Sequence, residues 1–240
     1  PFIIVSALAA WFGMNDLASA RSSFKEMSTI FKDKHNWLMC WLYIGTFGSF
    51  TAFSAGLALV MKVSFPDIDP IKFAFLGPLV GALARPVGGV LSDKLGGAWV
   101  TLWTFILMII TTLTVLQFLP QDGHGGSFNG FLISFLVLFA LTGIGNASTF
   151  QMIPVIYRKL HLNWGTEDAD PIAAKEAAAA IGFAGAIGAY GGFFIPKAFG
   201  STIKAFGGPD VALYVFAGFY LSCLLITWWY YFRKGAEMPC

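Results

Sequence analysis

Long apolar runs separated by short polar stretches dominate this chain. Six of the runs can cross a bilayer as helices, because a membrane-spanning helix needs about 20 predominantly apolar residues. Runs of this length favour bundled helices over a β-barrel, whose strands alternate over about 10 residues. The predicted spans are Trp37–Met61, Ile71–Ser92, Trp99–Leu119, Phe128–Tyr157, Ile172–Pro196 and Val211–Phe232.

The polar stretches divide the chain into four parts. Residues 1–14 are apolar but too short for a complete span, and we interpret them as the end of a preceding transmembrane helix. Residues 15–36 are polar and mixed in charge, which predicts a cytoplasmic linker without a site. Residues 37–232 form the predicted six-helix bundle, and residues 233–240 a cytoplasmic tail.

The composition supports an all-α membrane protein. Hydrophobic residues make up 57% of the chain and charged residues only 12%, whereas a soluble domain carries about 25% charged residues. The mean hydropathy is +0.70. A net charge of +2 gives no reason to expect a nucleic-acid partner. The cysteines show no metal or redox spacing, so we expect neither a metal nor a cofactor; they are Cys40, Cys223 and Cys240.

The basic residues predict an orientation in the membrane. Of the fifteen lysines and arginines, ten fall on one side of the predicted spans and four on the other. The side rich in lysine and arginine faces the cytoplasm in most membrane proteins. We therefore expect a multi-pass protein of the cytoplasmic membrane with its C-terminus inside.

Arg85 is the one charged residue in the interior of the predicted spans. The thirteen acidic residues and three histidines all fall in predicted loops or at helix starts. Such a bundle lacks the carboxylates and imidazoles that acid–base or metal catalysis needs, so the chain is predicted not to be an enzyme. A cation in hydrocarbon costs about 3 kcal/mol on insertion scales. A mobile anion held bidentately would offset that cost; the alternatives are backbone carbonyls or a side chain that reaches the interface.

Aromatic residues form a stripe on the first span. Tyr43, Phe47, Phe50 and Ser54 follow helical spacing, and they could surround a small planar ligand. Helix packing or lipid contact would explain the same stripe. In the fourth span, Asn146 is a polar residue that needs a partner in lipid.

Glycines crowd the fifth span. A face without side chains lets another backbone or a ligand approach closely. Ordinary packing of helices on small residues would also use such a face. The glycines are Gly182, Gly185, Gly188, Gly191 and Gly192.

The run GGVLSDKLGG, Gly88–Gly97, resembles the signature loop of the major facilitator superfamily, with Asp93 as its central acid. That loop follows the second helix of each six-helix half in the superfamily. The resemblance implies that the chain is one six-helix half and that Asp93 belongs to a gating loop.

Three longer runs resemble the nitrate/nitrite porter family, and together they imply its C-terminal half. They imply that Arg85 binds the anion, that Tyr43 and Phe47 line the pocket, and that Gly188 belongs to a signature beside it. The family places a second arginine, from the N-terminal half, at the same anion. The runs are AAIGFAGAIGAYGGFFIP, GIGNASTFQMIP and FLGPLVGALARPVGGVLSDKLGG.

The function implied by this resemblance is transport of nitrate and nitrite by alternating access, as exchange, across a bacterial inner membrane in nitrate assimilation. The N-terminal half and the lipid bilayer are the implied partners. A six-helix anion channel, a proton-coupled nitrate symporter and a non-transporting sensor or scaffold remain the alternatives. The spans hold no carboxylate or imidazole, which favours exchange over symport in this half.

Overall fold

The computed structural model describes residues 2–14, 28–120, 125–166 and 169–240. Helices account for the regular structure of these residues, and no strand occurs among them. Four of the elements are short 3-10 or π-helical segments that adjoin longer α-helices or connect them. The elements are α1 (Phe2–Gly13), η2 (Ser28–Lys32), α3 (Lys34–Tyr43), η3 (Ile44–Gly48), α4 (Ser49–Ser64), η4 (Pro70–Lys72), α5 (Leu76–Leu95), α6 (Gly97–Phe118), α7 (Phe128–Asn163), α8 (Ala169–Ala189), α9 (Gly191–Phe206), α10 (Asp210–Thr227) and η5 (Trp228–Phe232).

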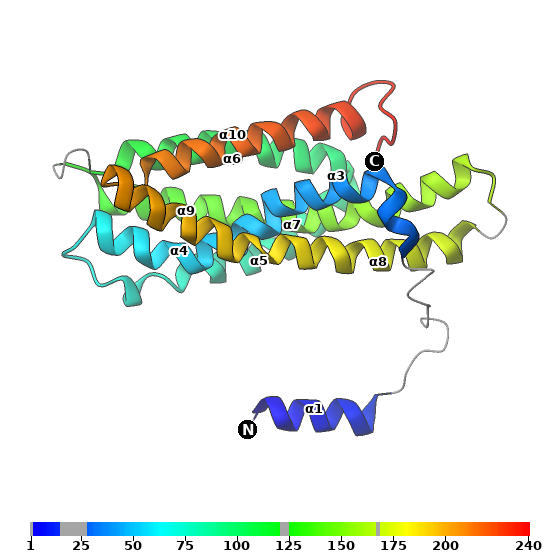
Figure 1. Ribbon diagram of the computed structural model, residues 1–240, viewed down its shortest axis with the longest axis horizontal. Coiled ribbons are helices and arrows are strands. Elements are labelled where there is room, and N and C mark those ends of the chain that lie inside the picture. Colours follow the sequence, from blue (N-terminus) through cyan, green and yellow to red (C-terminus); the bar gives the residue numbers. More distant parts are fainter. Residues whose placement is uncertain (1, 15–27, 121–124, 167–168) are drawn as a thin grey trace.

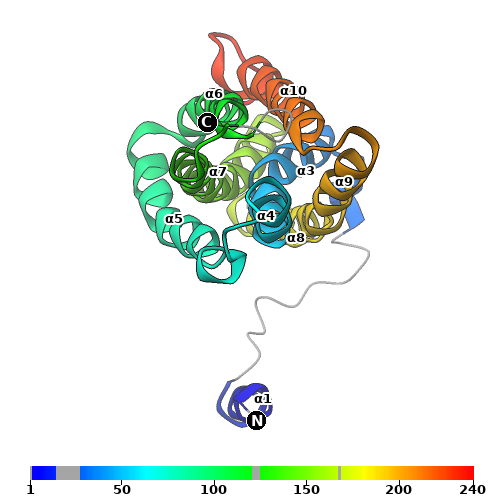
Figure 2. The same ribbon diagram turned by 90° about the vertical axis from the view of Figure 1, so that its left-hand side faces the viewer.

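The described residues contain six helical spans that are long and apolar enough to cross a membrane. These spans run side by side (Figure 1). Seen along the bundle, α5, α6, α8, α9 and α10 surround α3, α4 and α7 (Figure 2). The predicted all-α membrane fold with six spans is therefore confirmed. The spans are Lys34–Ser64, Pro70–Leu95, Gly97–Phe118, Phe128–Asn163, Ala169–Phe206 and Asp210–Phe232.

Four spans continue beyond their predicted ends, and the first and second do so by three residues each, to Ser64 and Leu95. α7 runs past Tyr157 to Asn163, and the fifth span runs past Pro196 to Phe206. Ending the fifth span at Pro196 was wrong, because transmembrane helices tolerate a proline where neighbouring groups satisfy the freed backbone. Lys197 consequently lies inside a helix, so Arg85 is not the only cation within the described spans.

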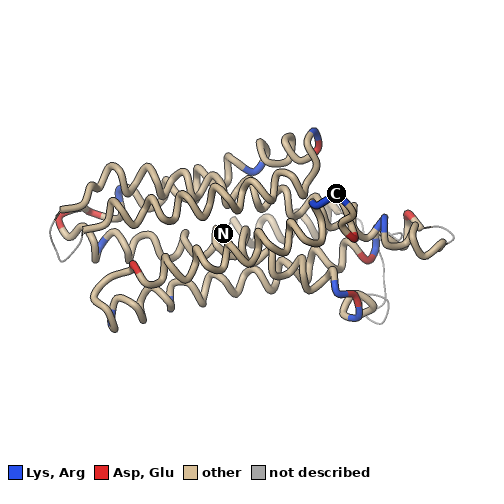
Figure 3. Tube along the Cα trace, turned by 90° about the horizontal axis from the view of Figure 1, so that it is seen from above, with Lys and Arg blue, Asp and Glu red and all other residues tan. Residues whose placement is uncertain are grey.

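Two histidines lie in helices rather than in loops, which corrects a second expectation. His35 is 1% exposed in α3, and its Nδ1 lies 3.1 Å from the hydroxyl of Tyr231. His161 is 5% exposed near the end of α7, and its Nε2 lies 2.8 Å from a carboxylate oxygen of Glu176. His124 lies outside the described residues. Charged residues gather toward the two ends of the bundle (Figure 3).

The predicted linker, residues 15–36, is described only from residue 28 onward. Residues 28–36 hold η2 and the start of α3, which begins at Lys34. Asp33 caps α3, since its carboxylate accepts a hydrogen bond from the His35 N–H at 3.0 Å. None of the residues of α1 is buried. The interpretation of residues 1–14 as the end of a preceding span stays a prediction.

The expected loop around Asp93 is helical. α5 continues through Asp93 to Leu95, and Gly96 turns the chain directly into α6. Gly96 adopts φ of 92°, a conformation that glycine adopts without steric cost. The glycine-rich run therefore makes a tight helix–helix corner, with the exposed Asp93 in the last turn of α5.

The predicted tail folds back onto one end of the bundle, which we call the tail end. Lys34 Nζ lies 2.6 Å from Glu237 Oε1, and Met238 is 5% exposed. The N–H of Ala98 donates to the carbonyl of Cys240 at 3.0 Å. Lys159 donates a hydrogen bond to the carbonyl of Pro239. The tail thus connects the first, third and fourth spans.

Replacing Glu237 by glutamine is expected to loosen this tail. The Lys34 ammonium lowers the pKa of the Glu237 carboxyl. The pair therefore stabilises the docked tail fully above the unfolded pKa of glutamate, about 4.3. This stabilisation is lost as the pH falls through the lower pKa of the folded state. Exposed pairs contribute about 0.2–1 kcal/mol. We expect labelling of the Cys240 thiol by maleimide at neutral pH to accelerate by about two- to fivefold.

Asp210→Asn, at the opposite end of the bundle, is the matched control and should leave the labelling rate unchanged. Burial raises the pKa of the Cys240 thiol to about 12, which keeps it unreactive while the tail is docked. Equal rates in the wild type and in Glu237→Gln would show that the pair does not hold the tail.

Candidate anion-binding site

Arg85 lies halfway along α5. It is nine residues from Leu76 and ten from Leu95, so each helix end is about 14 Å away at 1.5 Å per residue. The side chain is partly exposed. Among the ion pairs of the described residues, none involves Arg85. The guanidinium is therefore a membrane-embedded cation without a carboxylate partner in the described part of this chain.

Aromatic rings from the first span cover the guanidinium. Its Cζ lies 4.4 Å from the ring centroid of Phe50 and 5.8 Å from that of Phe47. Both distances allow a cation–π attraction. The ring of Tyr43 lies 5.4 Å from that of Phe47, at an interplanar angle of 33°. The predicted grouping of Arg85, Tyr43 and Phe47 thus occurs in the structure, and Phe50 belongs to it as well.

A π-helical turn reshapes the predicted aromatic stripe. η3, Ile44–Gly48, interrupts the α-helix of the first span, and π-turns are frequent at functional sites. The extra residue in the turn changes which side chains share a face. Ser54 does not offer its hydroxyl proton to a ligand, because its Oγ donates to the Phe50 carbonyl at 2.7 Å.

Asn146 of α7 connects Arg85 to Tyr43. The side chain is 6% exposed. The hydrogen-bonding network assigns its amide orientation: the oxygen accepts from Nη2 and Nε of Arg85, each at 3.2 Å, and the nitrogen donates to the Tyr43 hydroxyl at 3.0 Å. The opposite orientation would set amide N–H groups against the guanidinium N–H groups. The residue therefore bridges the cation and the phenol.

Glycines on either side of Arg85 hold α5 against α7. A Cβ added at Gly143 would overlap the carbonyl oxygen of Gly81, and one added at Gly88 would lie 2.7 Å from the Cα of Ile144. Gly81 and Gly88 lie four residues before and three residues after Arg85. These backbone contacts fix the height of Arg85 relative to Asn146. Sequence reasoning missed the two contacts, although the seven-residue spacing of the glycines could have indicated them.

The signature glycines of the fifth span have three different environments. A Cβ at Gly188 would lie 3.0 Å from the Phe47 ring and 3.1 Å from the Tyr43 ring, so a side chain there would enter the site. Gly191 packs on the backbone of Gly48, and Gly192 faces Thr51. Gly182 and Gly185 face open space. The span also breaks at Tyr190, between α8 and α9, so the glycines do not form one continuous face.

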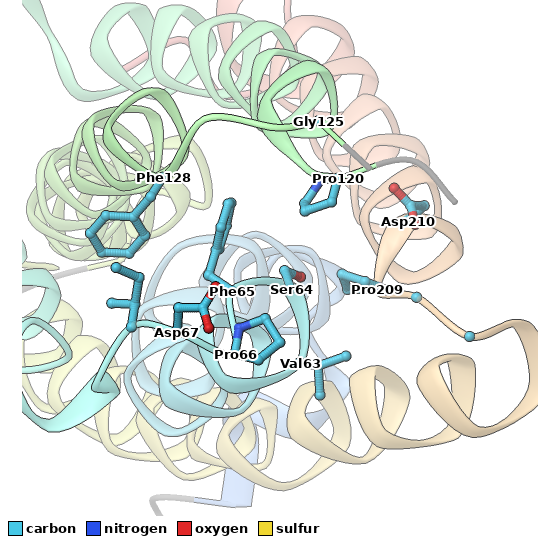
Figure 4. Close-up of a pocket in the computed structure, with 13 residues that line it drawn as sticks. Val63, Ser64, Phe65, Pro66, Asp67, Pro120, Gly125, Phe128, Pro209 and Asp210 are labelled. Atoms are coloured by element: carbon cyan, nitrogen blue, oxygen red, sulfur yellow. The ribbon is translucent and has the colours of Figure 1, made fainter. Parts of the chain in front are cut away.

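A cavity of about 470 Å³ lies at the end of the bundle opposite the tail end. Asp67 and Asp210 line it, together with apolar residues and glycines (Figure 4). None of its described lining residues is basic. Two carboxylates disfavour an anion there, so Arg85 marks the better anion site. The described residues hold no group of three or more histidines, cysteines and acids that could bind a metal.

The chain was compared with known proteins. No protein-family model matches it. It is 48% identical, over 98% of its length, to the nitrate/nitrite transporter NarU of Salmonella typhimurium, and 45% identical to NarU of Escherichia coli over the same share. It is 37% identical, over 100% of its length, to the probable nitrate/nitrite antiporter NarK2 of Thermus thermophilus. The matches cover 51–52% of these relatives, so the chain spans about half their length.

Proposed function

We propose that this chain, which is similar to nitrate/nitrite transporters over about half their length, acts as one six-helix half of a transporter that binds nitrate or nitrite at Arg85. Relatives that are named transporters agree with the prediction that the chain is not an enzyme.

The Arg85 guanidinium, which has no carboxylate partner among the described residues, is the observation that carries this proposal. A planar fork of N–H groups matches two oxygens of one small anion. Phe47 and Phe50 flank the fork, and Tyr43 and Gly188 complete the pocket on the side of the first and fifth spans. A planar monoanion bound there neutralises the arginine.

The exposed face of the bundle supports a second half as partner. Within an 18-residue apolar stretch of each span, the spans that carry Arg85 and the signature glycines have the smallest shares of buried residues, 17% and 28%. They flank α4 on one side of the bundle (Figure 2). We propose that the N-terminal half of a major facilitator covers this face and supplies a second arginine. The two halves rock around the anion, as in alternating access, with Asp93 and the open Gly182 and Gly185 at the moving contact.

Exchange is the transport mode that this half favours. Two arginines without an anion between them repel each other, which hinders the return of an empty transporter. The His161–Glu176 pair also lies within helices, but His161 is fifteen residues along α7 from Asn146, about 22 Å. This pair is too far away to exchange a proton directly with an anion at Arg85. The same proposal places the protein in a bacterial inner membrane with the tail end in the cytoplasm.

Nitrate uptake into proteoliposomes that contain the complete transporter tests this proposal. We expect rapid uptake when the vesicles are loaded with nitrite and little uptake when they are loaded with gluconate, because only nitrite refills the site from inside. Equal uptake into both would contradict exchange. Uptake that does not saturate with nitrate concentration would favour a channel, and uptake that depends on a pH gradient would favour symport.

A further inference from the structure

We propose that Asn146 orients Arg85 and Tyr43 so that this half presents only hydrogen-bond donors to the anion, and that the site therefore accepts nitrate and nitrite but rejects bicarbonate. The inference rests on the proposed function and names the residue that determines its selectivity. Bicarbonate is the demanding competitor because, like nitrate, it is a planar monoanion with three oxygens around one central atom.

The Asn146 oxygen occupies one edge of the guanidinium. It accepts from Nε and from one hydrogen of Nη2, each at 3.2 Å. Of the five N–H donors of an arginine, the two on Nη1 and the second on Nη2 remain. One hydrogen of Nη1 and the second hydrogen of Nη2 form the end-on edge of the fork, which suits two oxygens of one anion. Asn146 thus determines which edge of Arg85 a ligand meets.

The Asn146 nitrogen determines the direction of the Tyr43 hydroxyl. Its N–H donates to the Tyr43 oxygen at 3.0 Å. A phenol oxygen that accepts this bond keeps its own proton free. The Tyr43 proton is then available to the anion. The chain of bonds runs from Arg85 through Asn146 to the Tyr43 hydroxyl.

An anion that carries a proton fits this arrangement poorly. Nitrate and nitrite have only acceptor oxygens, so each bond offered by Arg85 and Tyr43 is used. Bicarbonate carries an O–H that needs an acceptor, and here it meets N–H and O–H groups. Asn146 is 6% exposed, which leaves water little room to accept that bond beside it. Sites built on hydrogen bonds reject ligands that leave a buried polar group unpaired.

The backbone contacts of α5 keep the arrangement in register. Gly81 and Gly88 pack on the backbone of α7 next to Asn146, so Arg85 cannot slide along α7. The ring of Phe50, 4.4 Å from Cζ, covers one flat side of the guanidinium. The Arg85 guanidinium is therefore oriented by the fold of this half before the ligand binds.

The test compares inhibitors of nitrate uptake by the complete transporter in nitrite-loaded proteoliposomes at neutral pH. The probes are bicarbonate, which carries a proton, and chlorate, an acceptor-only monoanion. In the wild type we expect inhibition by chlorate and none by bicarbonate. Asn146→Leu keeps the volume and removes both hydrogen bonds. We expect its nitrate KM to rise about tenfold, and bicarbonate to inhibit because the Tyr43 hydroxyl is free to turn and accept.

A merely space-filling role for Asn146 would leave this selectivity unchanged. Thr142→Val, one turn earlier on α7, is the matched control, since Thr142 Oγ1 donates only to the Phe139 carbonyl of its own helix. The double variant Tyr43→Phe/Asn146→Leu should not be inhibited by bicarbonate, because it lacks the Tyr43 hydroxyl oxygen that would accept the bicarbonate O–H. Unchanged selectivity in Asn146→Leu, or bicarbonate inhibition of the wild type, overturns the inference while nitrate exchange still stands. A wild type that takes up no nitrate overturns the proposed function itself.

Discussion

Replacing Arg85 by lysine is expected to reduce nitrate exchange by roughly tenfold to a hundredfold at low nitrate concentration. Lysine keeps the positive charge but carries a compact ammonium instead of a planar fork. It can satisfy Asn146 or the anion, whereas Arg85 has one edge for each. A lost hydrogen bond to a charged group costs about 1.5–3 kcal/mol. The measurement is the initial rate of nitrate uptake into nitrite-loaded proteoliposomes across a range of nitrate concentrations.

Arg233→Lys is the matched control for this substitution. The Arg233 guanidinium lies over the Trp229 ring, 4.0 Å from its centroid, and its Nε donates to the Trp229 carbonyl at the tail end. The same chemical change there should leave the uptake rate unchanged. Undiminished exchange in a well-folded Arg85→Lys transporter would mean that Arg85 has a structural role and that the anion binds elsewhere.

Replacing Gly143 by alanine is expected to destabilise the bundle by about 1–3 kcal/mol, the usual cost of overpacking a well-packed contact. The added methyl group would meet the carbonyl of Gly81. Backbone cannot rotate away as a side chain can, so α5 must move off α7. That movement also separates Arg85 from Asn146. The loss is measured as a lower unfolding temperature of the purified complete transporter in detergent, and as weaker nitrate exchange.

Gly218→Ala is the comparison for this variant. Gly218 lies in α10 with open space around its Cα, so the same change should be neutral or should stabilise the helix by up to about 1 kcal/mol. If both variants unfold at the same temperature, α5 and α7 do not depend on the Gly81–Gly143 contact.

The spans could be predicted because apolar runs of this length have few other structures. The unpaired Arg85 could also be recognised, since a charge among apolar residues stands out in the sequence. The end of the fifth span could not be located, because Pro196 looks like a helix terminator and only tertiary packing shows that the helix continues. Lys197, His35 and His161 were predicted outside the helices for a related reason, because the helices extend beyond the apolar runs that mark them in the sequence.

The internal connections of the site were beyond sequence reasoning. The π-turn at Ile44–Gly48 has no marker in the apolar pattern, and it determines where Phe47 and Phe50 lie. Asn146 could be recognised as a polar residue in need of a partner, but its two partners come from different spans. Such contacts between spans depend on how each helix is rotated about its axis, and a single sequence carries no information about that rotation. The tail showed no apolar run, so its docking through Glu237 was also unexpected.

Equilibrium binding of nitrate to the purified complete transporter tests the role of Arg85 most directly, because it separates anion binding from movement of the two halves. Titration calorimetry would compare the wild type, Arg85→Lys and Arg233→Lys. We predict saturable binding to the wild type and to Arg233→Lys, and at least tenfold weaker binding to Arg85→Lys. Equal nitrate affinity in all three proteins would contradict the assignment of Arg85 as the anion ligand.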